Sequence, residues 1–75
     1  MDKLYFDALE LVVKKGEISI AILQRAFKIG FARAAVLYDD FIAKGYVIKN
    51  PELPKYKINV TLEQIEELRK NKTNN

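Results

Sequence analysis

The side chains best suited to chemistry in this sequence are three basic residues, Arg25, Lys28 and Arg33, in a segment without acidic residues. No aspartate or glutamate occurs between Glu17 and Asp39. Basic side chains attract the phosphate backbone of nucleic acids, and arginine can also donate two hydrogen bonds to a guanine edge. The spacing therefore indicates an anion-binding surface, with a nucleic acid as the expected partner.

Each of these three residues also has an alternative role as an ordinary solvated charge. For Arg25, charge alone favours that plainer role. Lys28 precedes the start of a predicted helix, where phosphates are bound readily, so the two roles are about equally supported. Arg33 falls in the first turn of that helix, where the helix dipole disfavours a cation. We therefore interpret Arg33 as a contact to a base or a phosphate.

Catalysis is not expected. The chain has no histidine and no cysteine, so the commonest general base, the thiol nucleophile and the usual zinc ligands are missing. Ser19 has no base to activate it. Asp39 and Asp40 are adjacent, and adjacent helical side chains point in different directions, so they are better read as solvated charges. We predict no enzymatic activity, no metal site and no cofactor.

Composition predicts a single small domain. The chain has 75 residues, of which 49% are hydrophobic, and a net charge of +3. No apolar run is long enough to span a membrane, and Asp2, Asp7 and Glu10 interrupt any signal-peptide pattern. We expect a cytoplasmic protein without membrane attachment. The modest charge predicts weak binding to nucleic acid unless the positive charge lies on one face.

Helical spacing of apolar residues predicts three helices in the first 45 residues. The first begins at an Asp2 N-cap and stops at Gly16, and the second runs from a Ser19 cap to residue 27. A turn at Gly30 leads to the third, over residues 31–44. Residues 17 and 18 form an extended link that could pair as a strand. Two helices on a short turn outline a helix-turn-helix.

Strand-forming residues over 46–49 and 56–60 predict a hairpin that serves as a wing, with two prolines in its turn. Thr61 and Gln64 form a capping box, so a fourth helix is expected over about 61–70, with a frayed polar tail from Arg69. The expected fold is mainly α with a small β-hairpin, a winged helix-turn-helix plus an extra C-terminal helix. We divide it into residues 1–60 and 61–75.

The aromatic side chains follow the apolar stripes of these helices rather than an exposed sheet face. We therefore expect them in the core instead of on a base-stacking surface. The residues concerned are Tyr5, Phe27, Phe31, Tyr38 and Phe41.

Residues 23–35 read Leu-Gln-Arg-Ala-Phe-Lys-Ile-Gly-Phe-Ala-Arg-Ala-Ala. This run resembles the central motif of the gamma domain of FtsK/SpoIIIE-type DNA translocases. In that family the pattern is leucine or valine, Gln-Arg, any residue, Phe, a basic residue, Ile-Gly, an aromatic, a variable residue and Arg-Ala-Ala. The resemblance extends over about residues 2–60. It implies a bacterial winged helix that binds short guide sequences on double-stranded DNA for chromosome segregation.

The resemblance carries over only part of the family's DNA contacts. Arg33 matches an arginine of the motif. Ala32 stands where the family often has asparagine or threonine, and Val36 stands where it usually has a second arginine. Specific readout should therefore be narrower than in the family. The candidate DNA-binding residues are Arg25, Lys28, Phe31, Ala32, Arg33, Val36, Lys49, Lys55 and Lys57. The three hairpin lysines could instead protect a strand edge from aggregation.

The resemblance also implies an attached motor or a site-specific recombinase as possible partners. This sequence has no phosphate-binding loop, so it cannot itself hydrolyse ATP. A monomer is the expected state. The alternative function is a winged helix that binds a protein or forms a homodimer. Its surface would comprise Asp39, Asp40 and the acidic residues of the fourth helix, Glu63, Glu66 and Glu67.

Overall fold

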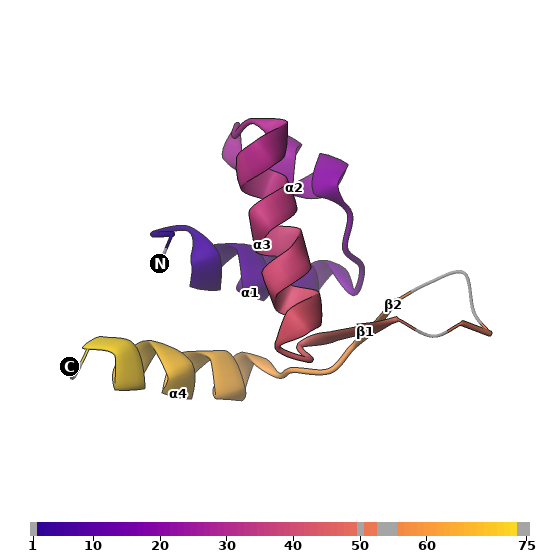
Figure 1. Ribbon diagram of the computed structural model, residues 1–75. Helices are drawn as coiled ribbons and strands as arrows, with labels where there is room; N and C mark the ends of the chain where they lie inside the picture. The colour runs from indigo at the N-terminus through magenta and orange to yellow at the C-terminus, as the bar shows by residue number, and fades with distance from the viewer. Residues whose placement is uncertain (1, 50, 53–55, 74–75) are drawn as a thin grey trace.

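The structure is a computed structural model that describes residues 2–49, 51–52 and 56–73. Its elements follow one another as α1 (Tyr5–Lys15), α2 (Ile20–Phe27), α3 (Phe31–Ala43), β1 (Val47–Lys49), β2 (Tyr56–Ile58) and α4 (Leu62–Thr73) (Figure 1). The two strands pair in an antiparallel hairpin. The mainly helical fold with one hairpin confirms the predicted class and is consistent with a winged helix.

The start of α1 differs from the prediction. The N-cap is Leu4, without a side-chain cap, and not Asp2. Asp2 instead lies one turn before the helix, where its carboxylate accepts the Leu4 N–H at 2.9 Å and its carbonyl accepts the Tyr5 N–H at 3.0 Å. The predicted end is confirmed, because Gly16 takes the left-handed conformation with φ 70° and its N–H bonds back to Val12 and Val13.

The predicted cap of α2 is confirmed, since the Ser19 hydroxyl accepts the Ile22 N–H at 3.0 Å. The turn to α3 is built differently from the prediction. Its left-handed residue is Lys28, with φ 53°, whereas Gly30 has the ordinary extended values of an N-cap. Glu17 and Ile18 link α1 to α2, but the described residues form no strand there.

The core lies among the first three helices and is closed by β1 and α4. Its largest fully buried side chains come from all of these elements: Leu9, Val12, Leu23, Leu37, Phe41, Val47 and Ile65. Tyr5 packs edge-on against Phe41, as the core assignment of these aromatics predicted. Phe31 contradicts that assignment. It is the first residue of α3 and is 62% exposed, because it precedes the part of the helix that faces the core.

The hairpin projects from the C-terminal end of α3 (Figure 1). Val47 pairs with Ile58, Ile48 with Lys57 and Lys49 with Tyr56. The Asn59 N–H then bonds to the Tyr46 carbonyl at 2.8 Å, which brings the chain back beside the end of α3. Tyr38 of α3 meets Tyr56 edge-on and so ties the hairpin to this helix.

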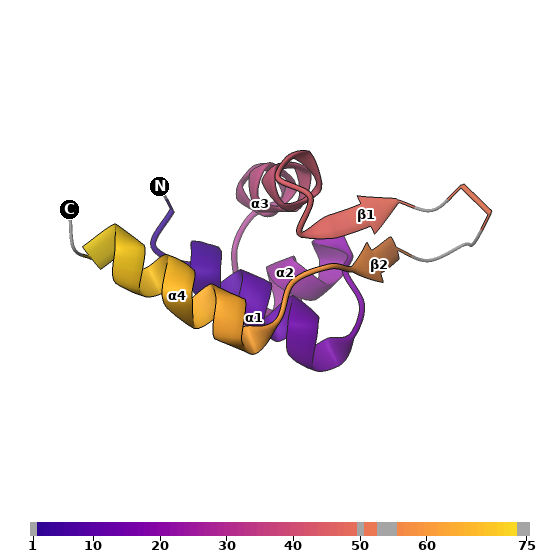
Figure 2. The ribbon, with the colours of Figure 1, turned by 90° about the horizontal axis from the view of Figure 1, so that it is seen from below.

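The fourth helix starts as predicted and ends later. Thr61 and Gln64 bond to each other in both directions, at 2.9 and 3.1 Å, which confirms the capping box. The helix runs on to Thr73, beyond the predicted end at about residue 70. It lies alongside α1 (Figure 2), and Ile65 is buried there. Packing of this edge stabilises a helix that is otherwise strongly polar.

Candidate nucleic-acid interface

Arg33, the residue expected to reach a base, is held by a carboxylate from outside the basic segment. Its Nε and Nη2 donate to the two oxygens of Asp2, both at 2.7 Å. The hydrogen bonds from Arg33, with a smaller contribution from the Leu4 N–H, lower the pKa of Asp2 to about 2, and the same pair raises the pKa of Arg33. Asp2 is therefore ionised at neutral pH.

The pairing gives Arg33 a structural role that sequence reasoning missed. Asp2 was interpreted only as a helix cap. The two residues lie 31 positions apart, and the sequence contains no signal that links them. The segment between Glu17 and Asp39 contains no acidic residue, but in the folded structure Asp2 lies beside it. The helix-dipole cost of an arginine in the first turn of α3 is offset by this carboxylate.

Arg25 and Lys28 keep the predicted basic character. Both side chains are exposed, and neither forms an ion pair within the described part of the chain. The Arg25 side chain lines a shallow hollow with Ser19 and Tyr56, and this hollow lies between α2 and the hairpin. Lys28 forms the turn just before α3. The structure therefore places Arg25, Lys28 and Arg33 on the helix-turn-helix unit, with Arg33 already engaged.

The exposed side of α3 is largely apolar. Phe31 and Val36 are 62% and 67% exposed, and Ala32 is exposed between them. Val36 shares a shallow pocket with Asp2 and Asp40, so the residues that should face DNA border on two carboxylates. Methyl and aromatic groups can contact a thymine methyl, but they cannot replace a bidentate hydrogen-bond donor.

The lysines of the hairpin do not act as one cluster. Lys49 lies opposite Tyr56, on the side of Val47 and Ile58, whereas Lys57 lies opposite the exposed Ile48 on the other side. Directly paired residues share a face and successive residues of a strand do not, so Lys49 and Lys57 point to opposite faces of the hairpin and only one of them can face a given phosphate strand. Lys55 lies outside the described residues.

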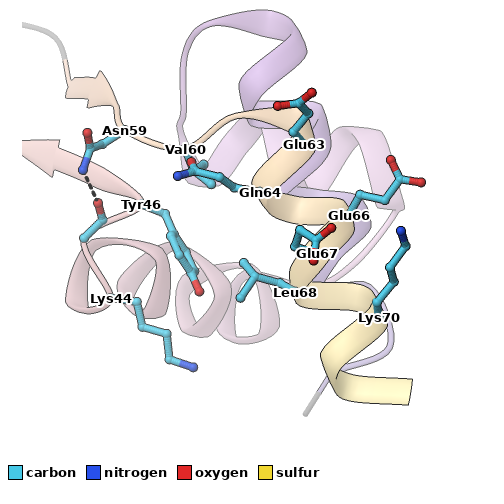
Figure 3. Close-up of a pocket in the computed structure, with 11 residues that line it drawn as sticks. Lys44, Tyr46, Asn59, Val60, Glu63, Gln64, Glu66, Glu67, Leu68 and Lys70 are labelled. Atoms are coloured by element: carbon cyan, nitrogen blue, oxygen red, sulfur yellow. Dashed lines mark hydrogen bonds between the residues drawn. The ribbon is translucent and has the colours of Figure 1, made fainter. Parts of the chain in front are cut away.

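The acidic surface lies away from this unit, on α4. A groove of about 780 Å³ runs between α4 and the end of α3 (Figure 3), with Tyr46 and Leu68 in its lining. Its rim carries the predicted partner residues Glu63, Glu66 and Glu67, which are exposed. Lys44 and Lys70 also line it. Asp40 is engaged elsewhere, because it accepts the Tyr5 hydroxyl hydrogen bond and lies 3.8 Å from the Lys44 ammonium.

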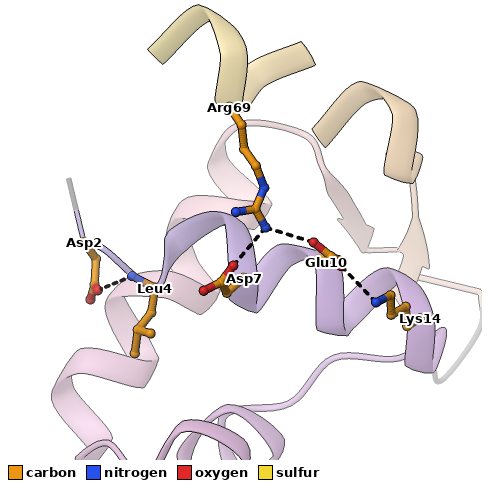
Figure 4. Close-up of polar contacts among 6 residues, drawn as sticks. All are labelled: Asp2, Leu4, Asp7, Glu10, Lys14 and Arg69. Carbon is orange, nitrogen blue, oxygen red and sulfur yellow. Dashed lines mark hydrogen bonds and ion pairs between the residues drawn. The ribbon is translucent and has the colours of Figure 1, made fainter. Parts of the chain in front are cut away.

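A second arginine binds carboxylates of α1. Arg69 of α4 donates from Nη2 to Asp7 and Glu10, both at 2.9 Å (Figure 4). Its guanidinium also lies 5.9 Å from the centre of the Phe6 ring. These contacts raise the pKa of Arg69. Lys14 joins the same network by an ion pair to Glu10 at 2.9 Å. This network joins α4 to α1 and leaves the helix-turn-helix surface untouched.

Within residues 2–49, 51–52 and 56–73, no group of three acidic side chains is arranged to hold a metal ion. None of the helices in these same ranges has both the length and the apolar character required to cross a membrane.

Comparison with known proteins connects this interface to a family. Residues 1–53 match the family profile described as the Ftsk gamma domain. Over 46 residues, 61% of this chain, it is 48% identical to the DNA translocase FtsK of Halalkalibacterium halodurans and to that of Listeria monocytogenes. It is 46% identical over the same length to the DNA translocase SpoIIIE of Bacillus subtilis. The matched part is 6% of each of these relatives.

The profile match takes in the three helices and β1, whereas β2 and α4 lie beyond it. It contains the two-helix unit with Arg25, Lys28 and Arg33. With more than half of its residues matched, this chain belongs to the FtsK gamma domain family.

Proposed function

We propose that this chain binds double-stranded DNA, with the N-terminal half of α3 in the major groove and the hairpin beside the backbone. The observation that carries the proposal is the pair of exposed basic residues Arg25 and Lys28, without an ion-pair partner among the described residues, on a helix-turn-helix unit next to the Arg33 side chain on α3. A helix of this kind presents its first residues to base edges, while neighbouring basic residues contact phosphates.

The N-terminus of α3 supports a phosphate contact at the turn. The first N–H groups of a helix lack partners within it and attract anions. Gly30, the N-cap, has an ordinary φ, and a side chain there would meet nothing in the protein. The fold therefore does not require glycine at this position. An approaching phosphate does favour it, since the bare backbone allows closer contact.

Binding should depend mainly on phosphates. Arg33 is the one arginine on the exposed start of α3, and Ala32 and Val36 cannot donate hydrogen bonds to bases. We therefore expect this chain to discriminate only weakly between DNA sequences, whereas the family motif implies recognition of specific guide sequences. As part of a larger translocase, such a domain would orient a motor on DNA. A recombinase is a second possible partner, and the domain acts as a monomer in this proposal.

Titration of an isotope-labelled protein with short duplexes tests the proposal by chemical-shift mapping. Perturbations should concentrate at Arg25, Lys28 and residues 30–36. Affinity should fall steeply between about 50 and 200 mM salt, because phosphate contacts release counterions. Arg25→Gln and Lys28→Gln should weaken binding to all sequences alike. Lys70→Gln, which removes the same charge from α4, is the control. Perturbations confined to α1 and α4 would contradict DNA binding through this unit.

The acidic groove on α4 favours a second candidate function, binding of a basic protein segment. Glu63, Glu66 and Glu67 are exposed at its rim, and Tyr46 and Leu68 offer apolar contact inside it. A lysine-rich peptide added to the labelled protein would shift these residues and not Arg25 or Lys28. The two functions use separate surfaces, so the same spectra distinguish them.

A further inference from the structure

The pair between Arg33 and Asp2 uses one edge of the guanidinium and leaves the other edge free. Nε and Nη2 donate to the carboxylate, each at 2.7 Å. A guanidinium carries five N–H donors in a planar fork. The two hydrogens on Nη1 and the second hydrogen on Nη2 are therefore not used by Asp2. Nη1 and Nη2 together form the end-on edge that fits the O6 and N7 acceptors of guanine.

The carboxylate that holds Arg33 is itself fixed. Asp2 accepts the Leu4 N–H at 2.9 Å, and its carbonyl accepts the Tyr5 N–H at 3.0 Å, so it is tied to the start of α1. Its side chain is 21% exposed, against 48% for Arg33. The anchor is thus the more enclosed partner and the arginine is the more accessible one. Asp2 also borders Val36, on the side of α3 that faces outward.

The pairing suits a base better than a phosphate. An arginine paired with a carboxylate has lost most of its net attraction for an anion, because the two charges nearly cancel at a distance. Its directional donors are retained, and they no longer have to be ordered when DNA arrives. Lower ordering cost on binding is the usual benefit of a preorganised side chain.

We propose that Asp2 is a positioning residue that holds the Arg33 guanidinium with its free edge toward the major groove, so that this pair reads a single guanine. The proposal rests on the proposed DNA binding and names the base that the site selects. It also assigns the remaining contacts of the segment, at Arg25 and Lys28, to phosphates. The negative charge of Asp2 weakens binding to every sequence, and the fixed arginine restores affinity only where a guanine is present.

The test measures guanine readout separately from affinity. A binding site is first selected from random duplexes, and each guanine in it is replaced in turn by 7-deazaguanine, which lacks the N7 acceptor. The dissociation constant for each replaced duplex is divided by that for the parent. One position should give a ratio toward the lower end of roughly 5 to 150, the range for a complete bidentate base contact, because 7-deazaguanine keeps the O6 acceptor. Arg33→Ala should bring that ratio close to 1.

Two variants with matched charge then separate positioning from general electrostatics. Asp2→Asn should tighten binding to all duplexes while the ratio at the read guanine falls several-fold. Asp7→Asn removes a nearby carboxylate of α1 that also binds an arginine, yet it should leave the ratio unchanged. Arg33→Lys keeps both charges but has no fork, so the ratio should fall close to 1. If Asp2→Asn is unstable, Asp2→Glu provides the measurement, because it keeps the charge but displaces the carboxylate by one methylene, and it should also lower the ratio several-fold.

The outcomes distinguish this inference from the function on which it rests. If no duplex binds, DNA binding and guanine readout both fail. If duplexes bind but every 7-deazaguanine ratio is near 1, or if Asp2→Asn keeps the full ratio, DNA binding stands and the positioning role of Asp2 is overturned. A merely structural role for Asp2 would lower the melting temperature without moving the ratio.

Discussion

Arg33 and Arg69 both bind carboxylates, Arg33 one just before α1 and Arg69 two within α1, and the difference between their surroundings separates two uses of the same interaction. Arg69 donates from Nη2 to Asp7 and Glu10 and lies over the Phe6 ring, so three groups of α1 hold it and tie α4 to this helix. Among the described residues, Asp2 is the one ion-pair partner of Arg33, and Ala32 and Val36 on the same side of α3 are exposed. One arginine completes the packing of a helix, whereas the other keeps donors directed away from the protein.

The surfaces that surround these two arginines also differ in charge. The surface around α2 and the start of α3 carries exposed basic residues, and that around α4 carries exposed acidic ones. A net charge of only +3 conceals this separation. Electrostatic attraction to DNA depends on how charge is distributed over a surface, so the small net charge does not preclude binding.

The largest expected effect tests the packing side of the comparison. Ile65 of α4 faces the core and is 1% exposed, whereas Leu62, one turn earlier in the same helix, is 44% exposed. Ile65→Ala should cost about 2–5 kcal/mol, because it leaves a cavity where α4 meets the core. At about 4–8 °C per kcal/mol for a domain of this size, the melting temperature should fall by about eight degrees or more. Leu62→Ala is the control and should change little. Equal, small shifts for both would mean that α4 does not contribute to the core.

A smaller effect is expected on base readout when the exposed side of α3 is altered. Asparagine at Ala32 together with arginine at Val36 should raise discrimination between the family's G-rich guide sequence and a scrambled duplex. The gain should be about 1–3 kcal/mol for each bidentate contact formed. Competition binding at fixed salt measures it. Strong preference for the guide sequence in the unaltered chain would show that other residues already read it.

The substitutions Arg33→Met and Arg69→Met should have opposite effects on stability and on DNA binding. Methionine keeps much of the apolar stem and removes the donors. Arg69→Met should lower the melting temperature by a few degrees with no change in DNA binding. Arg33→Met should change the melting temperature less, since exposed ion pairs contribute little to stability, and should remove guanine readout. Calorimetry and duplex titration on the same samples give both values. The reverse pattern would refute the distinction.

The smallest effect is a local one, the titration of Asp2. Its pKa is lowered from the ordinary 3.8 to about 2, chiefly by the hydrogen bonds from Arg33. A carboxyl group with a lowered pKa in the folded state adds stability above its ordinary pKa and loses that contribution as pH falls toward about 2. Carbon-detected NMR should therefore show a midpoint near 2, rising toward 3.8 in Arg33→Met. A midpoint near 3.8 in the unaltered chain would show that the pair does not persist in solution.

Most helix boundaries could be predicted because their signals are local. The Ser19 cap, the Gly16 stop and the Thr61–Gln64 capping box each join residues at most four positions apart. Hydrogen bonds of this kind form within one turn of helix, whatever the rest of the chain does. The start of α1 was misplaced because Asp2 makes a similar local bond one turn too early and serves another partner.

The candidate site was predictable in its residue types and less so in its geometry. The acid-free run identified Arg25, Lys28 and Arg33, and the exposed side of α3 carries Ala32 and Val36 as expected. Helical spacing assigned Phe31 to the core although the family motif made it a candidate for DNA contact, and it is exposed, because periodicity assigns a face to a helix but not the point at which that face meets the core. The separation of Lys49 from Lys57 depends on strand register, which neither strand specifies alone.

The sequence by itself therefore determined the order of helices and strands, the caps that delimit them and the basic segment on α2 and α3. Only the tertiary structure decided which charges meet. Asp2 reaches Arg33 across 31 positions, and Arg69 reaches Asp7 across 62. Such pairs form because packing of apolar faces brings distant side chains together, and the charges themselves contribute too little to direct it.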